Sequence, residues 1–295
     1  MLEVTRNTAN CPSDPSDLVV ETVDHRRRRA IESLVVLADG RVGWRGLSES
    51  CGSPARPATR VAGVYDSAEV SDLLAGPICT TIELRPSDGW SEAVELDMRD
   101  AVLTARLARP GQTVWVLRFV AASRPGVLVT RISGPADAVI VAPTMRPPAA
   151  DGVDVDAHGD SITVCDDGQA IVAVSHQHVE DTDDGQRTLT QYAAVGGGED
   201  PDRVRADVAA RLEAALGDGF EHLDAEHRRR SSQRWRSTRP DVEFDQQLEQ
   251  GLRFAQFHLL SASHGDGEVA IGARGLSGSA YRGHVFWDTD VFVVP

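Results

Sequence analysis

The feature that most constrains the fold is a long succession of short extended segments between residues 80 and 194. Each segment either alternates apolar and polar residues or is apolar throughout, and turns such as Asp88-Gly89 and Pro125-Gly126 separate them. Strands that recur at such short intervals with Gly/Pro turns are typical of an antiparallel β-sandwich. The segments are residues 80–84, 93–98, 102–107, 114–120, 127–132, 138–142, 162–165, 171–175 and 188–194.

The segment at residues 114–120 differs from the others because both of its faces are largely apolar. Val114, Val116 and Val120 lie on one face, and Trp115 and Phe119 lie on the other. A strand with two apolar faces is typically covered on both sides. We therefore expect this strand to lie in the interior of the molecule.

The pattern changes from strand to helix at the glycine run 196–198. Asp200 is a good helix N-cap and Pro201 fits the first helical position. Residues 204, 208, 212 and 216 are apolar and four apart, and Gly217 is a natural stop for that helix. A second helix is expected at about residues 221–235. A third amphipathic pattern has its apolar face at Phe244, Leu248, Leu252, Ala255 and Leu259.

The segment at residues 30–49 reads AIESLVVLADGRVGWRGLSE. Residues 34–37 and 42–45 are expected to pair as a hairpin around the Asp39-Gly40 turn. Trp44 and Arg45 belong either to a functional edge or to the packed interior, and packing is the commoner fate of a tryptophan in a strand. The preceding basic run, residues 25–29, suits either a nucleic-acid arm or a solvated segment, and we expect the solvated segment.

The composition excludes several classes of function. A formal net charge of −15 argues against a nucleic-acid partner, because phosphate binding needs a basic surface. All 30 basic residues are arginines, which excludes a P-loop, a Schiff-base enzyme and a Ser–Lys hydrolase. No apolar run approaches the roughly 18 residues that cross a bilayer, and residues 1–15 lack a signal-peptide pattern. We therefore expect a cytoplasmic protein without a membrane partner.

The cysteines and histidines do not have the spacing of a metal site. No cysteine pair is separated by two residues, so a zinc ribbon or a redox motif is not expected. His176 and His178 fall on one side of a strand, but a metal ion needs further ligands, and we expect them to be surface histidines. Free thiols are expected in a reducing compartment, with a disulfide as the alternative. The cysteines are Cys11, Cys51, Cys79 and Cys165.

The last stretch, residues 275–295, reads GLSGSAYRGHVFWDTDVFVVP and concentrates polar and aromatic side chains. A tryptophan ring offers an apolar face to sugar C–H groups, and charged groups exchange hydrogen bonds with hydroxyls. The stretch therefore suits a polyhydroxylated ligand. Its candidate binding residues are Tyr281, Arg282, His284, Trp287 and Asp288.

This stretch resembles the signature at the start of the catalytic barrel of glycoside hydrolase family 65. That family includes the disaccharide phosphorylases of maltose, trehalose, kojibiose and nigerose, and some trehalose hydrolases. A second resemblance lies at residues 31–49, where Ala38-Asp39 departs from the usual Gly-Asn of the family. Weaker similarities follow at residues 61–66, 96–107 and 117–133. The matching positions are Gly275, Leu276, Gly278, Tyr281, Gly283, His284, Phe286, Trp287, Asp288, Phe292 and Pro295, with Glu32, Ser33, Gly40, Gly43, Arg45, Gly46 and Glu49 in the second segment.

The resemblance implies a mainly β fold with further parts C-terminal to it. These are an N-terminal antiparallel β-supersandwich of the galactose-mutarotase type, a helical linker, and the truncated start of an (α/α)6 barrel. Their expected ranges are residues 1–198, 199–239 and 240–295. Because one amphipathic helix and a loop cannot bury their apolar faces alone, we expect the barrel to continue beyond Pro295.

The resemblance also implies an inverting reaction on α-linked glucose disaccharides. In the family a glutamic acid lying downstream of this signature protonates the glycosidic oxygen, and phosphate or water attacks from the opposite face. No catalytic residue is therefore expected within this chain, which would be inactive alone. Trp287 and Asp288 would line the glucose subsite, whereas Tyr281, Arg282 and His284 would either contact the sugar or brace the loop. Asp288 and Asp290 are too close in sequence to flank a scissile bond as an inverting pair.

Three hypotheses follow from these residues. The first is the N-terminal part of a family 65 phosphorylase or hydrolase, which would need no cofactor and would use inorganic phosphate as a co-substrate if it is a phosphorylase. Its partner would be a small α-glucoside disaccharide, and the full-length protein would form a homodimer. The second is a non-catalytic carbohydrate-binding or partner-binding β-sandwich module. The third is a stand-alone enzyme that uses only these residues.

Overall fold

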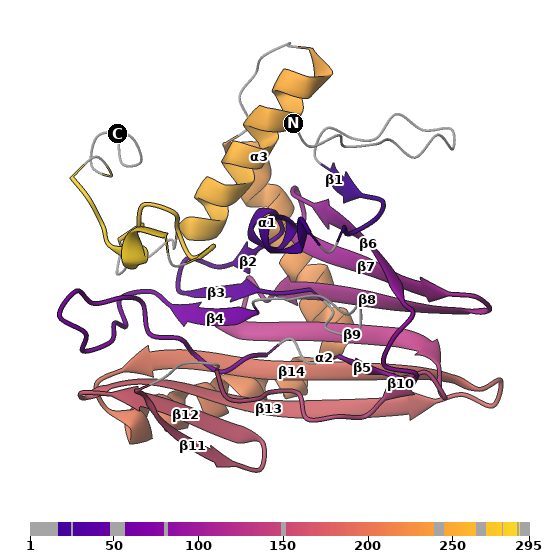
Figure 1. The fold of residues 1–295 in the computed structure, drawn as a ribbon, viewed down its shortest axis with the longest axis horizontal. Helices are drawn as coiled ribbons and strands as arrows, with labels where there is room; N and C mark the ends of the chain where they lie inside the picture. Colours follow the sequence, from indigo (N-terminus) through magenta and orange to yellow (C-terminus); the bar gives the residue numbers. More distant parts are fainter. Residues whose placement is uncertain are drawn as a thin grey trace.

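A large antiparallel sheet organises the molecule, and the sequence alternation explains its strands. The computed structural model describes residues 17–24, 26–47, 57–79, 82–148, 152–238, 245–263, 270–278, 280–287 and 289. Within these ranges nine strands form one sheet in the order β1-β6-β7-β8-β9-β14-β13-β12-β11, and every neighbouring pair is antiparallel (Figure 1). The strands are β1 (Asp17–Val20), β6 (Ser91–Asp97), β7 (Val102–Arg109), β8 (Gln112–Val120), β9 (Val127–Pro135), β11 (Asp154–His158), β12 (Ser161–Asp166), β13 (Gln169–Asp181) and β14 (Gln186–Gly198).

Shorter strands cover one face of this sheet and enclose the main core. A three-stranded sheet has the order β2-β3-β4, and β10 pairs with β5. The core between the layers contains side chains of both, including Trp44, Leu96, Val116 and Ile132. Mainly β architecture and the hairpin around Asp39-Gly40 are thereby confirmed. The short strands are β2 (Leu37–Ala38), β3 (Val42–Arg45), β4 (Ala58–Val61), β5 (Glu83–Leu84) and β10 (Val139–Ile140).

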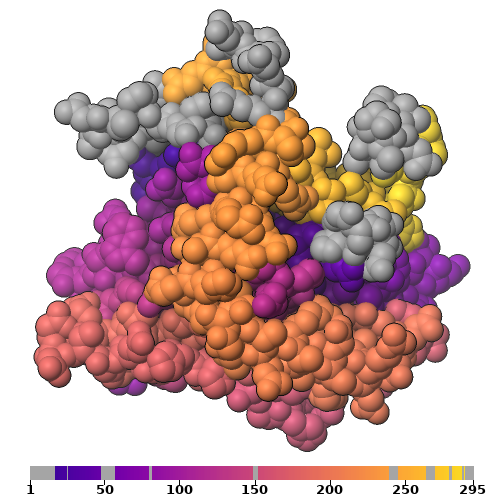
Figure 2. All heavy atoms as spheres, turned by 180° about the vertical axis from the view of Figure 1, so that it is seen from behind, coloured from indigo at the N-terminus to yellow at the C-terminus, as the bar shows by residue number. Residues whose placement is uncertain are grey.

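The opposite face of the sheet packs against a long helix, α2 (Pro201–Ser237). Figure 2 shows α2 lying across the strands on this side. The Asp200 side chain caps the helix by accepting hydrogen bonds from the backbone N–H groups of residues 202 and 203. The expected stop at Gly217 is wrong, because the helical geometry breaks instead at Gly219, whose φ is 75°. A glycine adopts that conformation without the steric cost that a side chain would add.

The third helix, α3 (Gln246–Ala262), packs on the end of α2 with a face other than the one expected. Leu248 and Leu259 are half exposed, and Phe257 is buried instead. Arg253 and Gln256 are buried beside it. The Gln256 amide donates to Trp235 O (3.0 Å) and Thr238 Oγ1 (2.8 Å), which makes its burial favourable.

Two further expectations from the sequence need correction. Residues 28–34 form a helix, α1 (Arg28–Leu34), so the first strand of the hairpin is only β2. Arg28, expected in a solvated run, is 1% exposed and forms an ion pair with Glu92 at 2.8 Å. On β8 one face is buried, but Trp115 on the other face is 52% exposed, because α2 covers that face only as far as Phe119.

Candidate functional site

The two segments that carry the sequence motifs meet in space. Gly43 on β3 lies so close to Leu276 that a Cβ atom built on it would fall 2.3 Å from Leu276 Cβ. Beside this contact, Arg45 Nη1 donates to Ser277 O (3.4 Å) and Arg45 Nη2 donates to Arg29 O (2.8 Å). Only a glycine at position 43 permits this approach. The N-terminal motif is therefore a platform on which residues 275–278 rest.

A buried group of charged side chains holds the backbone of this platform in place. The Glu32 carboxylate is fully buried, accepts a hydrogen bond from Leu47 N, and lies 3.7 Å from Arg45 Nη2. Arg118 on β8 donates to Gly46 O at 2.8 Å. Burial lowers the pKa of Arg118 to about 10, while the nearby Glu92 opposes that shift. Arg118 remains charged at neutral pH and holds the backbone just after β3.

Residues 281–284 are fastened to the segment that follows β4. Leu73 N donates to Arg282 O (3.2 Å), and Tyr65 Oη donates to Gly283 O (2.9 Å). The Arg282 guanidinium donates to the carbonyl of Val70. His284 Nε2 lies 2.7 Å from the carbonyl of Ser71, so this nitrogen carries the proton. The Tyr65 and His284 rings also meet edge to face, with centroids 5.6 Å apart.

Four of the five candidate binding residues lie within the described residues, and they form two groups. The fifth, Asp288, lies outside the described residues. Arg282 and His284 direct their polar groups at backbone carbonyls, so they hold the loop. Tyr281 and Trp287 are 62% and 77% exposed, so most of their side-chain surface faces solvent. Asp290 also lies outside the described residues. The structure thus brings four of the candidates onto one short loop.

The backbone of this loop is strained at two of these candidates. Tyr281 and Arg282 adopt φ angles of 58° and 55°, which side chains rarely occupy. Such residues cost about 1–3 kcal/mol each and cluster at functional sites. Next to them, the Tyr281 and Phe286 rings meet edge to face at 5.9 Å, and Phe286 and Val285 are also partly exposed. The strained loop therefore displays an aromatic surface, Tyr281–Phe286–Trp287, to solvent.

A cavity of about 650 Å³ lies beside the motif, between it and α3. Its lining includes Arg274, Leu276 and Thr289 from the motif region and Phe254 and His258 from α3. Burial lowers the pKa of His258, so its imidazole is neutral at pH 7. Of the five candidate residues, Tyr281, Arg282, His284 and Trp287 do not line this cavity.

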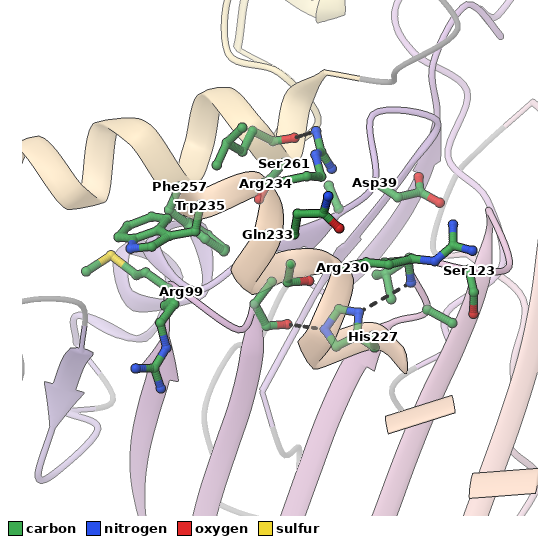
Figure 3. A pocket seen from close by; sticks show the side chains of 18 of the residues that line it. Asp39, Arg99, Ser123, His227, Arg230, Gln233, Arg234, Trp235, Phe257 and Ser261 are labelled. Atoms are coloured by element: carbon green, nitrogen blue, oxygen red, sulfur yellow. Dashed lines mark hydrogen bonds between the residues drawn. The ribbon is translucent and has the colours of Figure 1, made fainter. Parts of the chain in front are cut away.

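A second cavity, of about 620 Å³, lies between α2, α3 and the turns at the end of the sheet (Figure 3). His227 forms part of its wall, where Nδ1 accepts from Ala122 N (3.3 Å) and Nε2 donates to Ala101 O (3.2 Å). Its ring also stacks on Phe119 at 4.7 Å. Burial lowers the pKa of His227 to about 4. The sequence pattern gave no signal for this cavity, because the arginines at 228–230 read as an ordinary helix surface.

Metal and thiol chemistry have no visible site in the part of the chain described above. No cluster of three or more His, Cys, Asp or Glu side chains is placed there to hold a metal ion. His178 lies 3.4 Å from Glu180 on the exposed part of β13. Cys79 and Cys165 are free thiols, and burial raises the pKa of Cys79 to about 12. Cys11 and Cys51 lie outside the described residues. No helix among those described is long and apolar enough to span a membrane.

A family model matches the part of the chain that contains the C-terminal motif, and curated relatives each match a share of the chain. Residues 253–295 match the family model for the glycosyl hydrolase family 65 central catalytic domain. The chain is 38% identical over 96 residues to an α,α-trehalose phosphorylase of Thermoanaerobacter brockii. This alignment covers 32% of this chain and 12% of that protein. It is 41% identical over 81 residues to a kojibiose phosphorylase of Halothermothrix orenii, covering 26% of this chain and 10% of the relative.

The fold comparison covers far more of the chain. A solved structure assigned as a kojibiose phosphorylase from the human microbiome superposes with a TM-score of 0.78 at 18% identity. The match spans 96% of this chain and 44% of that one. This likeness confirms the fold, and the sequence matches confirm the resemblance of parts of this chain to proteins of family 65. The chain therefore corresponds to less than half the length of the solved relative.

Proposed function

We propose, from the relationship to glycoside hydrolase family 65, that this chain is the N-terminal part of a phosphorylase or hydrolase of α-linked glucose disaccharides. The similar proteins named above are phosphorylases of trehalose and kojibiose. Within that protein we assign residues 1–198 to a β-supersandwich, 199–239 to a helical linker and 240–295 to the start of the catalytic barrel. Inorganic phosphate would serve as co-substrate if the protein is a phosphorylase, and no cofactor would be needed.

The observation that carries this proposal is the docking of the C-terminal motif on the N-terminal one. Gly43 and Arg45 receive residues 276 and 277, and the segment after β4 fastens residues 282–284. Two motifs that lie far apart in sequence thereby cooperate to present one short loop. A strained loop held from two sides keeps its outward side chains in a fixed position, as a binding surface requires.

Each candidate residue has a distinct role in the proposed glucose subsite. Trp287, the most exposed aromatic side chain among the described residues, packs its ring face against sugar C–H groups. Asp288 accepts hydrogen bonds from glucose hydroxyls. Tyr281 extends the aromatic surface, whereas Arg282 and His284 act as positioning residues through their bonds to Val70 and Ser71.

The proposed chemistry is inversion at the anomeric carbon, which needs a general acid on one face of the sugar and phosphate or water on the other. The resemblance places the acid C-terminal to the motif, so the 295 residues contribute sugar contacts and no proton transfer. We therefore propose that they do not turn over substrate alone. Trehalose, kojibiose, maltose and nigerose incubated with phosphate and this chain should release no glucose 1-phosphate above a blank. Release of glucose 1-phosphate that depends on the chain would overturn the proposal that the 295 residues are inactive alone.

The sugar-binding part is tested by calorimetric titration of trehalose and kojibiose into the chain. Replacing Trp287 by alanine removes the proposed stacking surface and should weaken binding by about fivefold to thirtyfold, as loss of an aromatic contact of about 1–2 kcal/mol would. Trp115→Ala is the matched control, since Trp115 is also exposed but lies on β8, away from the motif. Equal weakening of binding by both substitutions, or unchanged binding in both variants, would contradict the proposed subsite.

A further inference from the structure

We infer that the cavity between α2, α3 and the end of the large sheet binds a small organic acid, a monocarboxylate carried on an apolar body. Its volume of about 620 Å³ falls in the range of small-molecule sites. Its floor is apolar and includes Val120, Ala121, Phe257 and Leu260. None of residues 275–287 lines this cavity, so the inference is independent of the sugar site.

Two of the three arginines that line the cavity, Arg230 and Arg234, lie one helical turn apart on α2. Arg230 binds the Glu226 carboxylate through Nε (2.9 Å) and Nη2 (2.8 Å), which leaves Nη1 for another acceptor. Arg234 uses Nη2 for its bonds to Leu260 O (2.9 Å) and Ser263 O (3.2 Å). Both guanidiniums therefore retain donors that a carboxylate can accept.

An unsatisfied hydroxyl lies on the same side of the cavity as Arg230. Ser123 Oγ, in the turn between β8 and β9, is inaccessible to solvent and has no hydrogen-bond partner among the described residues. An unpaired buried polar atom is unfavourable unless something binds it. In Figure 3 Ser123 and Arg230 lie on the same side of the cavity, and Arg99 lies well apart from them. A carboxylate between Ser123 and Arg230 would satisfy the hydroxyl and the free guanidinium donor together.

The other charges near the cavity limit the ligand to a single negative charge. Asp39 is held by the backbone N–H groups of Arg41, Val42 and Gly126 at 2.7–3.0 Å and contributes a negative charge. Glu226 offsets Arg230, and Arg99 is paired with Asp97 and Asp100. Because these acidic groups roughly balance the arginines, a dianion would meet more repulsion than a monoanion.

The walls of the cavity are fixed before any ligand binds. His227 joins α2 to the turn that carries Ser123 through its bond to Ala122 N. Arg234 joins α2 to the end of α3. A preformed site loses little conformational entropy on binding, so few contacts suffice for specificity.

The test uses the whole chain and three probes of similar size, benzoate, benzyl alcohol and phenyl phosphate, titrated by calorimetry. Benzoate should bind saturably, and the two others should bind about tenfold more weakly or not at all. No saturable benzoate binding, or binding of benzyl alcohol or phenyl phosphate as tight as that of benzoate, would overturn the inference.

Variants then locate the binding. Arg230→Gln and Ser123→Ala should each weaken benzoate binding by about fivefold to tenfold. The matched control is Arg229→Gln, because Arg229 also lies near Glu226 (3.6 Å) on α2 but does not line the cavity. Arg234 is left intact because it holds the end of α3. Equal weakening by Arg229→Gln, or unchanged binding by both cavity variants, would contradict the assignment.

Discussion

At the scale of single residues, Arg28 and Glu92 show that a charged side chain can be buried when an opposite charge is buried beside it. Both side chains are 1% exposed in their ion pair, and Arg118 lies close enough for Glu92 to affect its pKa. Taking a charge out of water costs several kcal/mol unless an opposite charge and hydrogen bonds replace the solvent. The intact ion pair therefore adds little net stability, but breaking it would leave a buried charge in the interior, which is strongly destabilising.

Removal of the Glu92 carboxylate should be strongly destabilising. Glu92→Ala removes the buried carboxylate that forms an ion pair with Arg28 and is expected to lower the free energy of unfolding by about 3–5 kcal/mol, measured by urea denaturation. Glu95→Ala on the same strand is the control, since Glu95 is exposed, and it should change stability by less than about 0.5 kcal/mol. A loss below about 1 kcal/mol for Glu92→Ala would show that Arg28 finds another partner.

His227 should make stability depend on pH in a predictable direction. Burial lowers its folded-state pKa to about 4, whereas an unfolded histidine titrates near 6.5. Below pH 6.5 the unfolded state therefore binds a proton that the folded state does not, so stability falls as the pH drops toward 4. The contribution is about 3 kcal/mol over that window.

The measurement compares urea unfolding at pH 7 and pH 5 for the wild type and His227→Gln, which should lose this part of the pH dependence. His222→Gln on the exposed side of α2 serves as the control and should keep it. If His227→Gln and the wild type lose equal stability between the two pH values, His227 is not the group responsible.

At the scale of elements, the contact between β3 and residues 275–278 depends on the absence of a side chain at Gly43. An alanine Cβ would lie 2.3 Å from Leu276 Cβ and 2.7 Å from Leu276 O, so the motif loop must move. Gly43→Ala should cost about 1–3 kcal/mol and speed amide hydrogen exchange in residues 270–287. Gly217→Ala, where nothing lies within 4 Å, should leave that exchange unchanged. Unaltered exchange in Gly43→Ala would contradict the docking.

The orientation of α3 gives a second prediction at this scale. Leu248 and Leu259 are about half exposed, whereas Phe257 is 2% exposed. The double substitution Leu248→Gln/Leu259→Gln should therefore change the free energy of unfolding by less than about 1 kcal/mol in total. Phe257→Ala should cost about 3–5 kcal/mol. Thermal and urea unfolding of both variants test the difference, and a reversed order would mean that α3 packs through the leucine face.

At the scale of the whole molecule, the strands could be predicted because alternation and turn residues are local signals. Seven strands of the nine-stranded sheet found among the described residues, β6 to β9 and β12 to β14, match predicted segments, and the fold class is confirmed. The predicted segment at residues 138–142 instead pairs with β5 as β10, and β11 was not among the predicted segments. Arg28 and the face of α3 could not be predicted, because their burial depends on partners distant in sequence, Glu92 and Trp235.

The candidate site was predictable only in part for the same reason. The motif indicated which residues of the loop to consider, but not that Arg282 and His284 bind backbone carbonyls of residues 70 and 71. The weak similarity at residues 61–66 was a signal for this neighbouring segment, because Tyr65 donates to Gly283 O. Neither cavity could be predicted, since each is assembled by elements that meet only in the fold.

The central claim, that the motif loop contacts glucose through Trp287, is tested most directly by fluorine NMR of the chain labelled with 5-fluorotryptophan. The five tryptophans provide their own controls, because Trp44, Trp90 and Trp235 are buried and Trp115 is exposed elsewhere. Titration with trehalose or kojibiose should shift the Trp287 resonance saturably and leave the Trp115 resonance in place. An unmoved Trp287 signal, or an equal shift of Trp115, would contradict the account.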